Sequence, residues 1–199
     1  MNWLAHALLS EPGDTEAQLG NLLADVVKGR DRAGMSAEFL RGVRRHQAID
    51  AFTDSHPAVH RSRSRIADEH RRFAGVLSDV FYDHLLAIQW DRHAETAAPL
   101  AEFTADLYGR AQLCSIELPP MARAVLERMI AGDWLGSYIR IEGVEATLRR
   151  ISRRLTARLG RPFALESATE ELEANFDGLV EDFEEFFPAL RRRVQDVVD

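Results

Sequence analysis

Apolar residues recur at helical spacing along almost the whole chain, and this periodicity constrains the fold more than any other feature. In TEAQLGNLLADVVKG (residues 15–29), leucines and valines stand three or four positions apart, which places them on one face of a helix. Similar stripes continue to a last predicted helix over residues 166–197, and no segment shows the alternation of a half-buried strand. The sequence therefore predicts an all-α fold, a helical bundle in a single domain that spans residues 1–199.

Residues that begin and end helices give this prediction its boundaries. Ser36 is placed to cap the helix that follows it, and Gly29 is placed to end the helix before it. Pro57 is expected to break the chain's second long helix, because the residue before proline avoids helical geometry. A long helical stretch is predicted from residue 61 to 90 with an interruption near residues 73–75, and Gly160 is predicted to end a later helix.

Charge and cysteine content exclude several classes of protein. The net charge of −7 argues against a general nucleic-acid binder, whose surface would be basic. The single cysteine, Cys114, excludes an intrachain disulfide framework and a thiolate-rich zinc site. Since the first residues show neither a basic leader nor a full-length apolar segment, we expect a soluble, cytoplasmic protein without a membrane span.

Acidic and imidazole side chains interrupt the apolar stripes in four separate segments. On the helix that begins after Ser36, three of them are spaced i, i+4 and i+8 and so share one face. Two aspartates in SDVFYDHLL repeat the i, i+4 spacing, and a histidine follows the second. The candidate residues are His6, Asp25, His46, Asp50, Asp54, Asp79, Asp83 and His84.

A divalent metal ion would explain why such residues recur among apolar neighbours. Carboxylates that face into one bundle core repel each other unless a positive charge lies between them, and helical bundles build metal sites in this way. Imidazole and carboxylate ligands suit manganese, iron, magnesium or zinc. The alternatives that stay open are a solvated face for His46, Asp50 and Asp54, a helix N-cap for Asp79, a core position for His6 and an ion pair of Asp25 with Lys28.

Five fragments in a fixed order give the chain a family resemblance. They are MNWLAHALLS, GNLLADVVKG, GVRRHQAIDAFTDSHPAV, SDVFYDHLL and LEANFDGLVEDFEEFFPAL. Together they extend over nearly the whole chain, and in this order and with similar gaps the sequence resembles the bacterial acyl carrier protein phosphodiesterases. These enzymes are similar to an atypical branch of the HD-domain phosphohydrolases, which are all-helical and use a divalent metal.

The resemblance implies a reaction and a metal. The expected reaction is hydrolysis of the phosphodiester between 4'-phosphopantetheine and a serine of holo-acyl carrier protein, which gives apo-carrier protein and free 4'-phosphopantetheine. The expected metal is Mn²⁺, with Mg²⁺ or Fe²⁺ as possible substitutes. The alternatives are an HD-type phosphohydrolase that acts on a nucleotide or another small phosphodiester, and a helical scaffold without enzymatic activity.

The usual HD signature is a histidine followed by an aspartate, and here the order is reversed at Asp83 and His84. The ligands therefore cannot be assigned by simple correspondence. The expected ligands, in order of preference, are Asp25, His46, Asp83 and His84, followed by Asp50 and His6. Asp79 or Asp54 would accept a proton from water or orient the histidines, and Arg44 or Arg45 would neutralise charge on the phosphate.

Arginine clusters suggest how a protein substrate would bind. Lys28 is the only lysine, and the remaining cations are arginines gathered in several short segments. For any one cluster, a solvated helix surface is the simpler interpretation. Acyl carrier proteins are small and strongly acidic, however, so a basic rim would steer them toward the site. Arg61, Arg63 and Arg65 are the expected docking residues.

Overall fold

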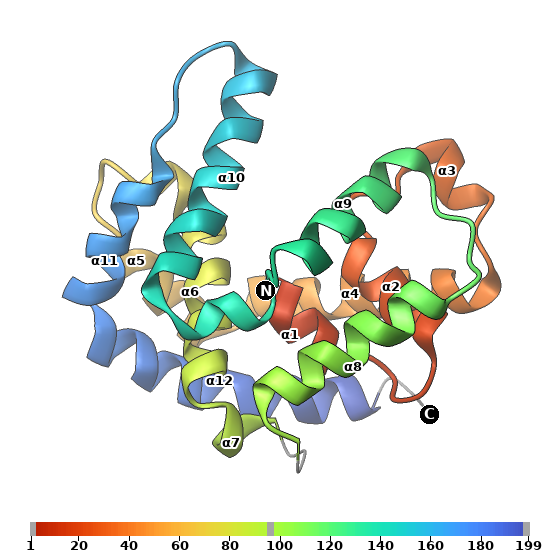
Figure 1. Ribbon diagram of the computed structural model, residues 1–199. Helices are drawn as coiled ribbons and strands as arrows, with labels where there is room; N and C mark the ends of the chain where they lie inside the picture. Colours follow the sequence, from red (N-terminus) through yellow and green to blue (C-terminus); the bar gives the residue numbers. More distant parts are fainter. Residues whose placement is uncertain (1–2, 95–97, 197–199) are drawn as a thin grey trace.

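The computed structural model describes residues 3–94 and 98–196, and every regular element within these two ranges is helical (Figure 1). The all-α prediction is confirmed. None of the helices in these ranges is both long enough and apolar enough to span a membrane.

The α-helices are α1 (Trp3–Leu8), α2 (Thr15–Leu23), α3 (Gly29–Ala33), α4 (Ala37–Ser55), α5 (Pro57–Arg65), α6 (Ala74–Ile88), α7 (Trp90–His93), α8 (Leu100–Leu113), α9 (Pro120–Ala131), α10 (Ile141–Leu159), α11 (Thr169–Ala174) and α12 (Phe176–Asp196).

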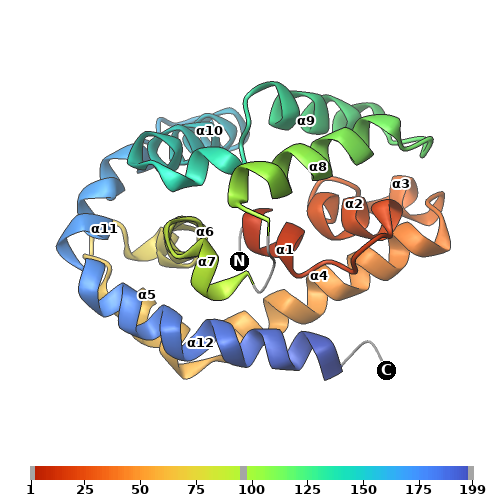
Figure 2. The same cartoon turned by 60° about the horizontal axis from the view of Figure 1, so that its bottom comes forward.

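The helices form three rough layers, which Figure 2 shows in projection. Helices α8, α9 and α10 lie along one side, and α4, α5 and α12 lie along the other, with α1, α2 and α6 between them. Helix α6 is buried over most of its length because residues such as Phe81, Tyr82 and Leu85 fill the core. The short helix α1 packs against both α2 and α6, so it joins the two halves of the middle layer.

Three predicted helix boundaries agree with the structure because each depends on local chemistry. The Ser36 hydroxyl accepts a hydrogen bond from the Phe39 N–H at 3.1 Å and caps α4. Helix α4 ends at Ser55, and Pro57 starts α5, where a missing N–H costs nothing. Gly160 ends α10 in the left-handed conformation with φ of +68°.

The prediction that Gly29 ends the second helix is wrong. Helix α2 stops at Leu23, and the Val26 and Val27 N–H groups both turn back to the Leu23 carbonyl. Gly29 instead opens α3 with a φ of +58°. Because the helix ends early, Asp25 leaves the apolar stripe, and its side chain is 69% exposed.

One of the longer predicted helices is interrupted as expected, and another is divided where no break was predicted. The stretch predicted from residue 61 to 90 is interrupted between α5 and α6, where residues 71–73 form a short 3-10 turn, so the break lies slightly before the predicted residues 73–75. The helix predicted over residues 166–197 is divided into α11 and α12 at Asn175, whose side-chain amide donates to the Glu171 carbonyl at 3.0 Å. The predicted end of that helix, Val197, lies outside the described residues.

Two glycines allow α2 and α4 to cross with their backbones in contact. A Cβ atom on Gly42 would lie 1.9 Å from the Ala17 carbonyl oxygen, and one on Gly20 would lie 2.0 Å from the Phe39 carbonyl oxygen. Any larger residue at either position would force the helices apart, since protein interiors are close-packed. This crossing places Asn21 of α2 beside His46 of α4.

A buried carboxylate joins α12 to α5. Asp182 is 1% exposed, and its oxygens accept hydrogen bonds from Arg61 at 2.8 Å, Ser62 at 2.9 Å and Arg65 at 3.1 Å. With three donors, this charge is satisfied without a metal. Asp182 therefore has a structural role in the layer that α4, α5 and α12 form.

Candidate metal centre

Three predicted ligands converge where α1 and α4 meet. His6 Nε2 lies 3.2 Å from one Asp50 oxygen, and His46 Nε2 lies 3.0 Å from the other. The two imidazole rings stack with centroids 4.0 Å apart. One ligand atom from each of the three residues lies within 4.8 Å of the other two, which is the spacing needed to hold a metal ion.

Asn21, which sequence reasoning missed, fixes the orientation of both rings. Its buried side-chain oxygen lies 2.9 Å from His6 Nδ1, while its main-chain carbonyl lies 2.8 Å from His46 Nδ1. The side-chain amide nitrogen donates to the His6 carbonyl at 2.8 Å and to the Ser10 hydroxyl at 2.9 Å, so the side-chain oxygen is the acceptor. A carbonyl oxygen can only accept, and each Nδ1 must therefore carry the proton.

With Nδ1 of each ring engaged, the Nε2 atoms of His6 and His46 face the Asp50 carboxylate. Burial lowers the pKa of His6 to about 4, so the His6 imidazole is neutral near pH 7. Burial alone would raise the pKa of Asp50, but its contacts with His46 and His6 outweigh burial and lower that pKa below its usual range. Three ligand atoms therefore point at one small volume, and His46 Nε2 is buried without a hydrogen bond. Such an arrangement fits a divalent cation.

Solvent reaches the cluster from one side. His6 is 1% exposed and the Asp50 side chain is 39% exposed, so the carboxylate is the accessible member. Asp25 lies farther out, with one oxygen 3.9 Å from His46 Nε2 and the other 3.4 Å from Lys28 Nζ. The ion pair between Asp25 and Lys28, which the sequence offered as an alternative to a ligand role, is thus present. Asp25 also lies at the edge of the cluster.

Asp83 does not join the cluster. Its carboxylate is fully buried and accepts hydrogen bonds from the N–H groups of Leu4 at 2.8 Å and Ala5 at 3.1 Å. These donors belong to the first turn of α1, where backbone N–H groups have no partner within the helix. Burial raises the pKa of Asp83 to about 7, although the two hydrogen bonds oppose the shift. The geometry gives Asp83 a structural role, to anchor the helix that carries His6.

His84 also points to a partner outside the cluster. Its Nδ1 lies 2.7 Å from the Tyr138 carbonyl, and the ring is buried. Burial lowers the pKa of His84, so this ring is neutral as well. Its proposed role as a ligand has no support from the described geometry.

Asp79 and Asp54 lie on either side of Arg63. Arg63 Nη2 is 2.7 Å from Asp54 and 3.9 Å from Asp79. Asp54 is 67% exposed, whereas Asp79 is less exposed and its pKa is raised, chiefly by burial and also by the nearby charge of Asp50. Helix α6 begins at Ala74, so the alternative in which Asp79 caps this helix is wrong.

The arginines predicted to act at the site are mostly held by other groups. Arg45 Nε donates to the Leu9 carbonyl at 2.6 Å, and burial lowers its pKa. Arg61 and Arg65 pair with Asp182, and Arg61 also pairs with Glu185. With Arg63 bound to Asp54, all three arginines of the predicted docking set have carboxylate partners.

The described residues contain one further group that could hold a metal, formed by Glu69, His70 and Glu171. Its side chains lie nearer the surface than the His6, His46 and Asp50 cluster, and Glu171 accepts a hydrogen bond from the Ala67 N–H at 3.3 Å. Exposed acidic groups commonly occur without an ion. The buried cluster is therefore the better candidate for a metal centre.

The sequence is similar to one family of known proteins over almost its whole length. A family model described as acyl carrier protein phosphodiesterase matches residues 1–190. A curated relative of that name from Escherichia coli is 31% identical over 192 residues, which cover 96% of this chain and 95% of the relative. One from Photorhabdus laumondii is 29% identical over 198 residues, which cover 98% of this chain and 96% of the relative. No solved structure matches, so the likeness to the HD-domain fold stays a prediction.

Proposed function

The chain belongs to the family of acyl carrier protein phosphodiesterases, and we therefore propose that it hydrolyses the phosphodiester that joins 4'-phosphopantetheine to a serine of holo-acyl carrier protein. The products would be apo-carrier protein and free 4'-phosphopantetheine. The proposal includes a divalent metal, with Mn²⁺ first among the candidates, and a cytoplasmic location.

The observation that carries the proposal is the convergence of three ligand atoms on one point. His6 and His46 both donate at Nδ1, so the Nε2 atoms of the two rings lie next to the Asp50 carboxylate. Without a cation, one imidazole would have to carry a second proton, and burial disfavours that proton on His6. A doubly charged ion satisfies all three ligands at once, and imidazole and carboxylate are ligands that Mn²⁺ accepts.

A divalent ion in this site would supply two effects, a lower pKa for a water molecule and neutralisation of charge on the phosphate oxygens. The protein would supply geometry. Asn21 fixes the two imidazoles, and Asp83 fixes the helix that carries His6, so the ligands are oriented before substrate binds. Asp25 and Asp50 border the solvent side, where the phosphodiester would enter.

Proton transfer can be assigned to Asp79 as a part of the same proposal. Its pKa is raised by burial, and a carboxylate with a raised pKa is a stronger general base. The oxygen of water would form a bond to phosphorus while the bond from phosphorus to the serine oxygen breaks. One proton of the water would pass to Asp79 and from there, through solvent, to the serine oxygen, which leaves as a hydroxyl. Arg63, beside Asp79, would stabilise the ionised carboxylate before it accepts the proton.

The direct test is incubation of the purified protein with Mn²⁺ and holo-acyl carrier protein, followed by mass spectrometry of the carrier protein. The expected result is the loss of one phosphopantetheine group and recovery of a free serine. A carrier protein that keeps its mass, together with hydrolysis of a nucleotide phosphodiester, would contradict the proposed substrate and favour a small-molecule phosphohydrolase. If the protein neither cleaves a phosphodiester nor binds Mn²⁺, the scaffold alternative would hold.

A matched pair of histidine variants tests the site itself. His46→Gln removes a cluster ligand, and we expect it to abolish turnover and weaken Mn²⁺ binding in isothermal titration calorimetry. His84→Gln changes an equally buried imidazole that binds a main-chain carbonyl instead, and we expect it to keep its Mn²⁺ affinity. The opposite order, with Mn²⁺ affinity lost only in His84→Gln, would transfer the metal site to α6.

A further inference from the structure

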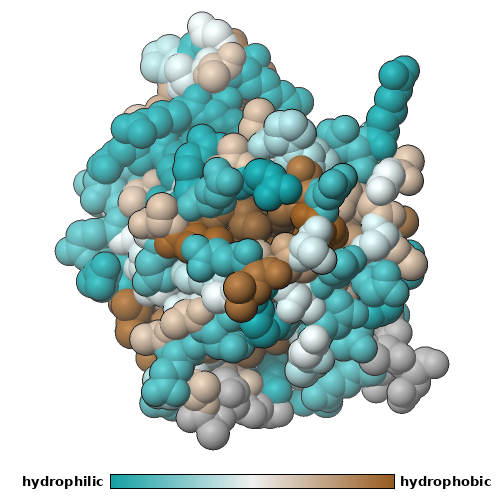
Figure 3. Space-filling model, turned by 45° about the vertical axis from the view of Figure 1, so that its right-hand side comes forward, coloured by the Kyte–Doolittle hydropathy of each residue, from teal (hydrophilic) through white to brown (hydrophobic). Residues whose placement is uncertain are grey.

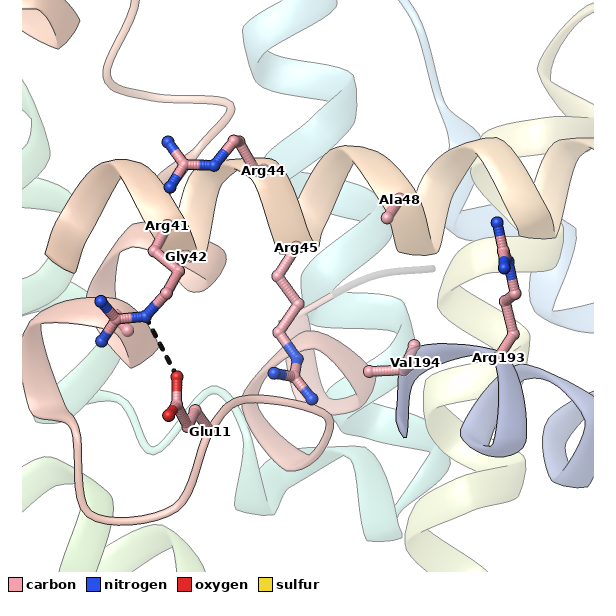
Figure 4. Close-up of a pocket in the computed structure, with 9 residues that line it drawn as sticks. Glu11, Arg41, Gly42, Arg44, Arg45, Ala48, Arg193 and Val194 are labelled. Carbon is pink, nitrogen blue, oxygen red and sulfur yellow. Dashed lines mark hydrogen bonds and ion pairs between the residues drawn. The ribbon is translucent and has the colours of Figure 1, made fainter. Parts of the chain in front are cut away.

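A hollow lined by arginines borders α4, the helix that carries two residues of the candidate metal centre. It has a volume of about 280 Å³ and is bounded by α4, the segment after α1 and the end of α12 (Figure 4). Arg41 and Arg45 point into it from α4, and Arg193 projects from α12 toward the same space. Arg44 is at its edge, so the lining includes four arginines and one carboxylate, Glu11.

A second hollow, of about 600 Å³, adjoins the first and shares Arg45 and Val194 with it. It adds Arg110 and Arg191, while its one carboxylate, Asp106, is paired with Arg110 at 2.8 Å. We refer to the two hollows together as the arginine groove. Its lining thus carries six arginines against two carboxylates, and it runs along the segment that joins α1 to α2.

Several of these guanidinium groups are not neutralised. Arg41 pairs with Glu11 and Asp14, but within the described part of the chain Arg44, Arg45 and Arg193 form no ion pair. By contrast, the three arginines at positions 61, 63 and 65 meet four carboxylates, at positions 54, 79, 182 and 185. That face has no surplus of positive charge. In the arginine groove, Arg44, Arg45 and Arg193 lack a paired carboxylate among the described residues, in a chain whose net charge is −7.

We propose that the arginine groove, rather than the face around Arg61, is where the acidic surface of the carrier protein docks. This inference rests on the proposed function, because the partner is taken to be a carrier protein. A net positive groove attracts an acidic partner and excludes most others, and arginine forms paired hydrogen bonds with carboxylates. The apolar parts of the lining, such as Ala48 and Val194, would pack against the helix that presents those carboxylates.

The arginine groove and the cluster share helix α4. Arg45 precedes His46 in α4, and Arg44 lies about 200° around the helix from His46, on the side away from the cluster. One rigid helix therefore carries both the docking residues and two cluster ligands, and fixes the spacing between them.

One face of the molecule is hydrophilic over most of its area, and hydrophobic side chains gather in a strip across its middle (Figure 3). The arginine groove combines charge and depth in one place.

Binding of apo-acyl carrier protein tests the groove separately from catalysis, because the apo form lacks the bond to be cleaved. We expect the double variant Arg44→Glu/Arg193→Glu to bind apo-carrier protein about tenfold more weakly and to lose the salt dependence of binding. With holo-carrier protein, KM should rise by a similar factor. Fluorescence anisotropy at several ionic strengths and steady-state kinetics give these values.

The matched control is Arg154→Glu/Arg158→Glu on α10, which changes net charge equally at two exposed positions that lie outside the groove. We expect its binding to differ from the unaltered chain by less than twofold. Equal weakening in both double variants would show an effect of net charge alone and overturn the docking site, as would full binding in both. If the unaltered chain binds apo-carrier protein but does not cleave the holo form, the proposed function fails and the docking surface stands.

Discussion

Replacement of Gly42 by alanine gives the sharpest test of how the fold builds the metal centre. The new Cβ would lie 1.9 Å from the Ala17 carbonyl oxygen and 2.7 Å from the Asn21 nitrogen, and Cβ contacts below 3.0 Å essentially never occur. All the atoms it meets belong to the backbone of α2, so no side chain can rotate away. Helices α2 and α4 must separate by about 1 Å.

The same displacement affects a bond in the metal centre. His46 Nδ1 lies 2.8 Å from the Asn21 carbonyl, and a separation of about 1 Å lengthens this contact to about 3.8 Å, beyond hydrogen-bonding range. Overpacking costs about 1–3 kcal/mol, and the lost hydrogen bond costs about 1 kcal/mol. Alanine gains about 1 kcal/mol over glycine in a helix, so a net loss of about 1–3 kcal/mol in unfolding free energy is expected.

Gly109→Ala is the matched control. Gly109 lies inside α8, and a Cβ atom there would have no neighbour within 4 Å. We expect this variant to gain about 0.5–1 kcal/mol in stability, because only the preference of alanine for the helix remains. Urea unfolding gives both free energies, and calorimetric titration with Mn²⁺ gives the affinity, which should fall only in Gly42→Ala. The reasoning is refuted if the two variants unfold at the same urea concentration and bind Mn²⁺ equally well.

Three other variants test single interactions. Asn21→Leu should lower Mn²⁺ affinity about 10–100-fold in calorimetry, since it removes the group that orients His6; unchanged affinity would contradict the role of this amide. Asp182→Asn should cost about 2–3 kcal/mol in urea unfolding, because its arginine partners lose their counter-charge; a loss below 1 kcal/mol would contradict it. In metal-free protein, Asp83→Asn should make stability rise with pH between about 4 and 6.5, by up to about 3 kcal/mol. An unchanged pH profile would contradict the last expectation.

The sign of this pH effect follows from two opposite shifts. The pKa of His6 falls from 6.5 to about 4 on folding, so the unfolded chain binds more protons between these values and stability rises with pH. The pKa of Asp83 rises from 3.8 to about 7, so the folded chain binds more protons and stability falls with pH. The two effects oppose each other between pH 4 and 6.5, and removal of the carboxyl group at position 83 leaves the effect of His6 without the opposing effect of Asp83.

Features that depend on a few neighbouring residues could be predicted from the sequence. The periodicity of apolar residues predicted the all-α fold, and Ser36 and Pro57 marked helix ends because capping and proline geometry are local effects. His46 and Asp50 were expected on one face because residues four positions apart are neighbours on a helix, and they contact each other in the structure.

Features that depend on distant contacts could not be predicted in the same way. Asp83 looked like a ligand because a histidine follows it, yet its partners are backbone N–H groups of α1, which sequence patterns do not reveal. Asn21 gave one weak signal, since a polar residue stood in an apolar stripe beside Gly20. Asp25 was predicted to lie in the core because the apolar stripe continues on both sides of it. Helix α2 instead ends at Leu23, in a turn that Arg32 supports by donating a hydrogen bond to the Ala24 carbonyl at 2.6 Å. The sequence pattern does not reveal this contact.

Two carboxylates with opposite pKa shifts explain why the candidate metal centre depends on the position of α1. Asp50 has its pKa lowered and faces two imidazoles, an arrangement that fits a divalent cation. Asp83 has its pKa raised and is satisfied by the first turn of α1. Helix α1 has only six residues and cannot be stable alone, so its position depends on Asp83 at one end and on the contacts of His6 at the other. Since His6 is the only cluster ligand that α1 contributes, a metal ion bound in the cluster and the docking of this helix would stabilise each other.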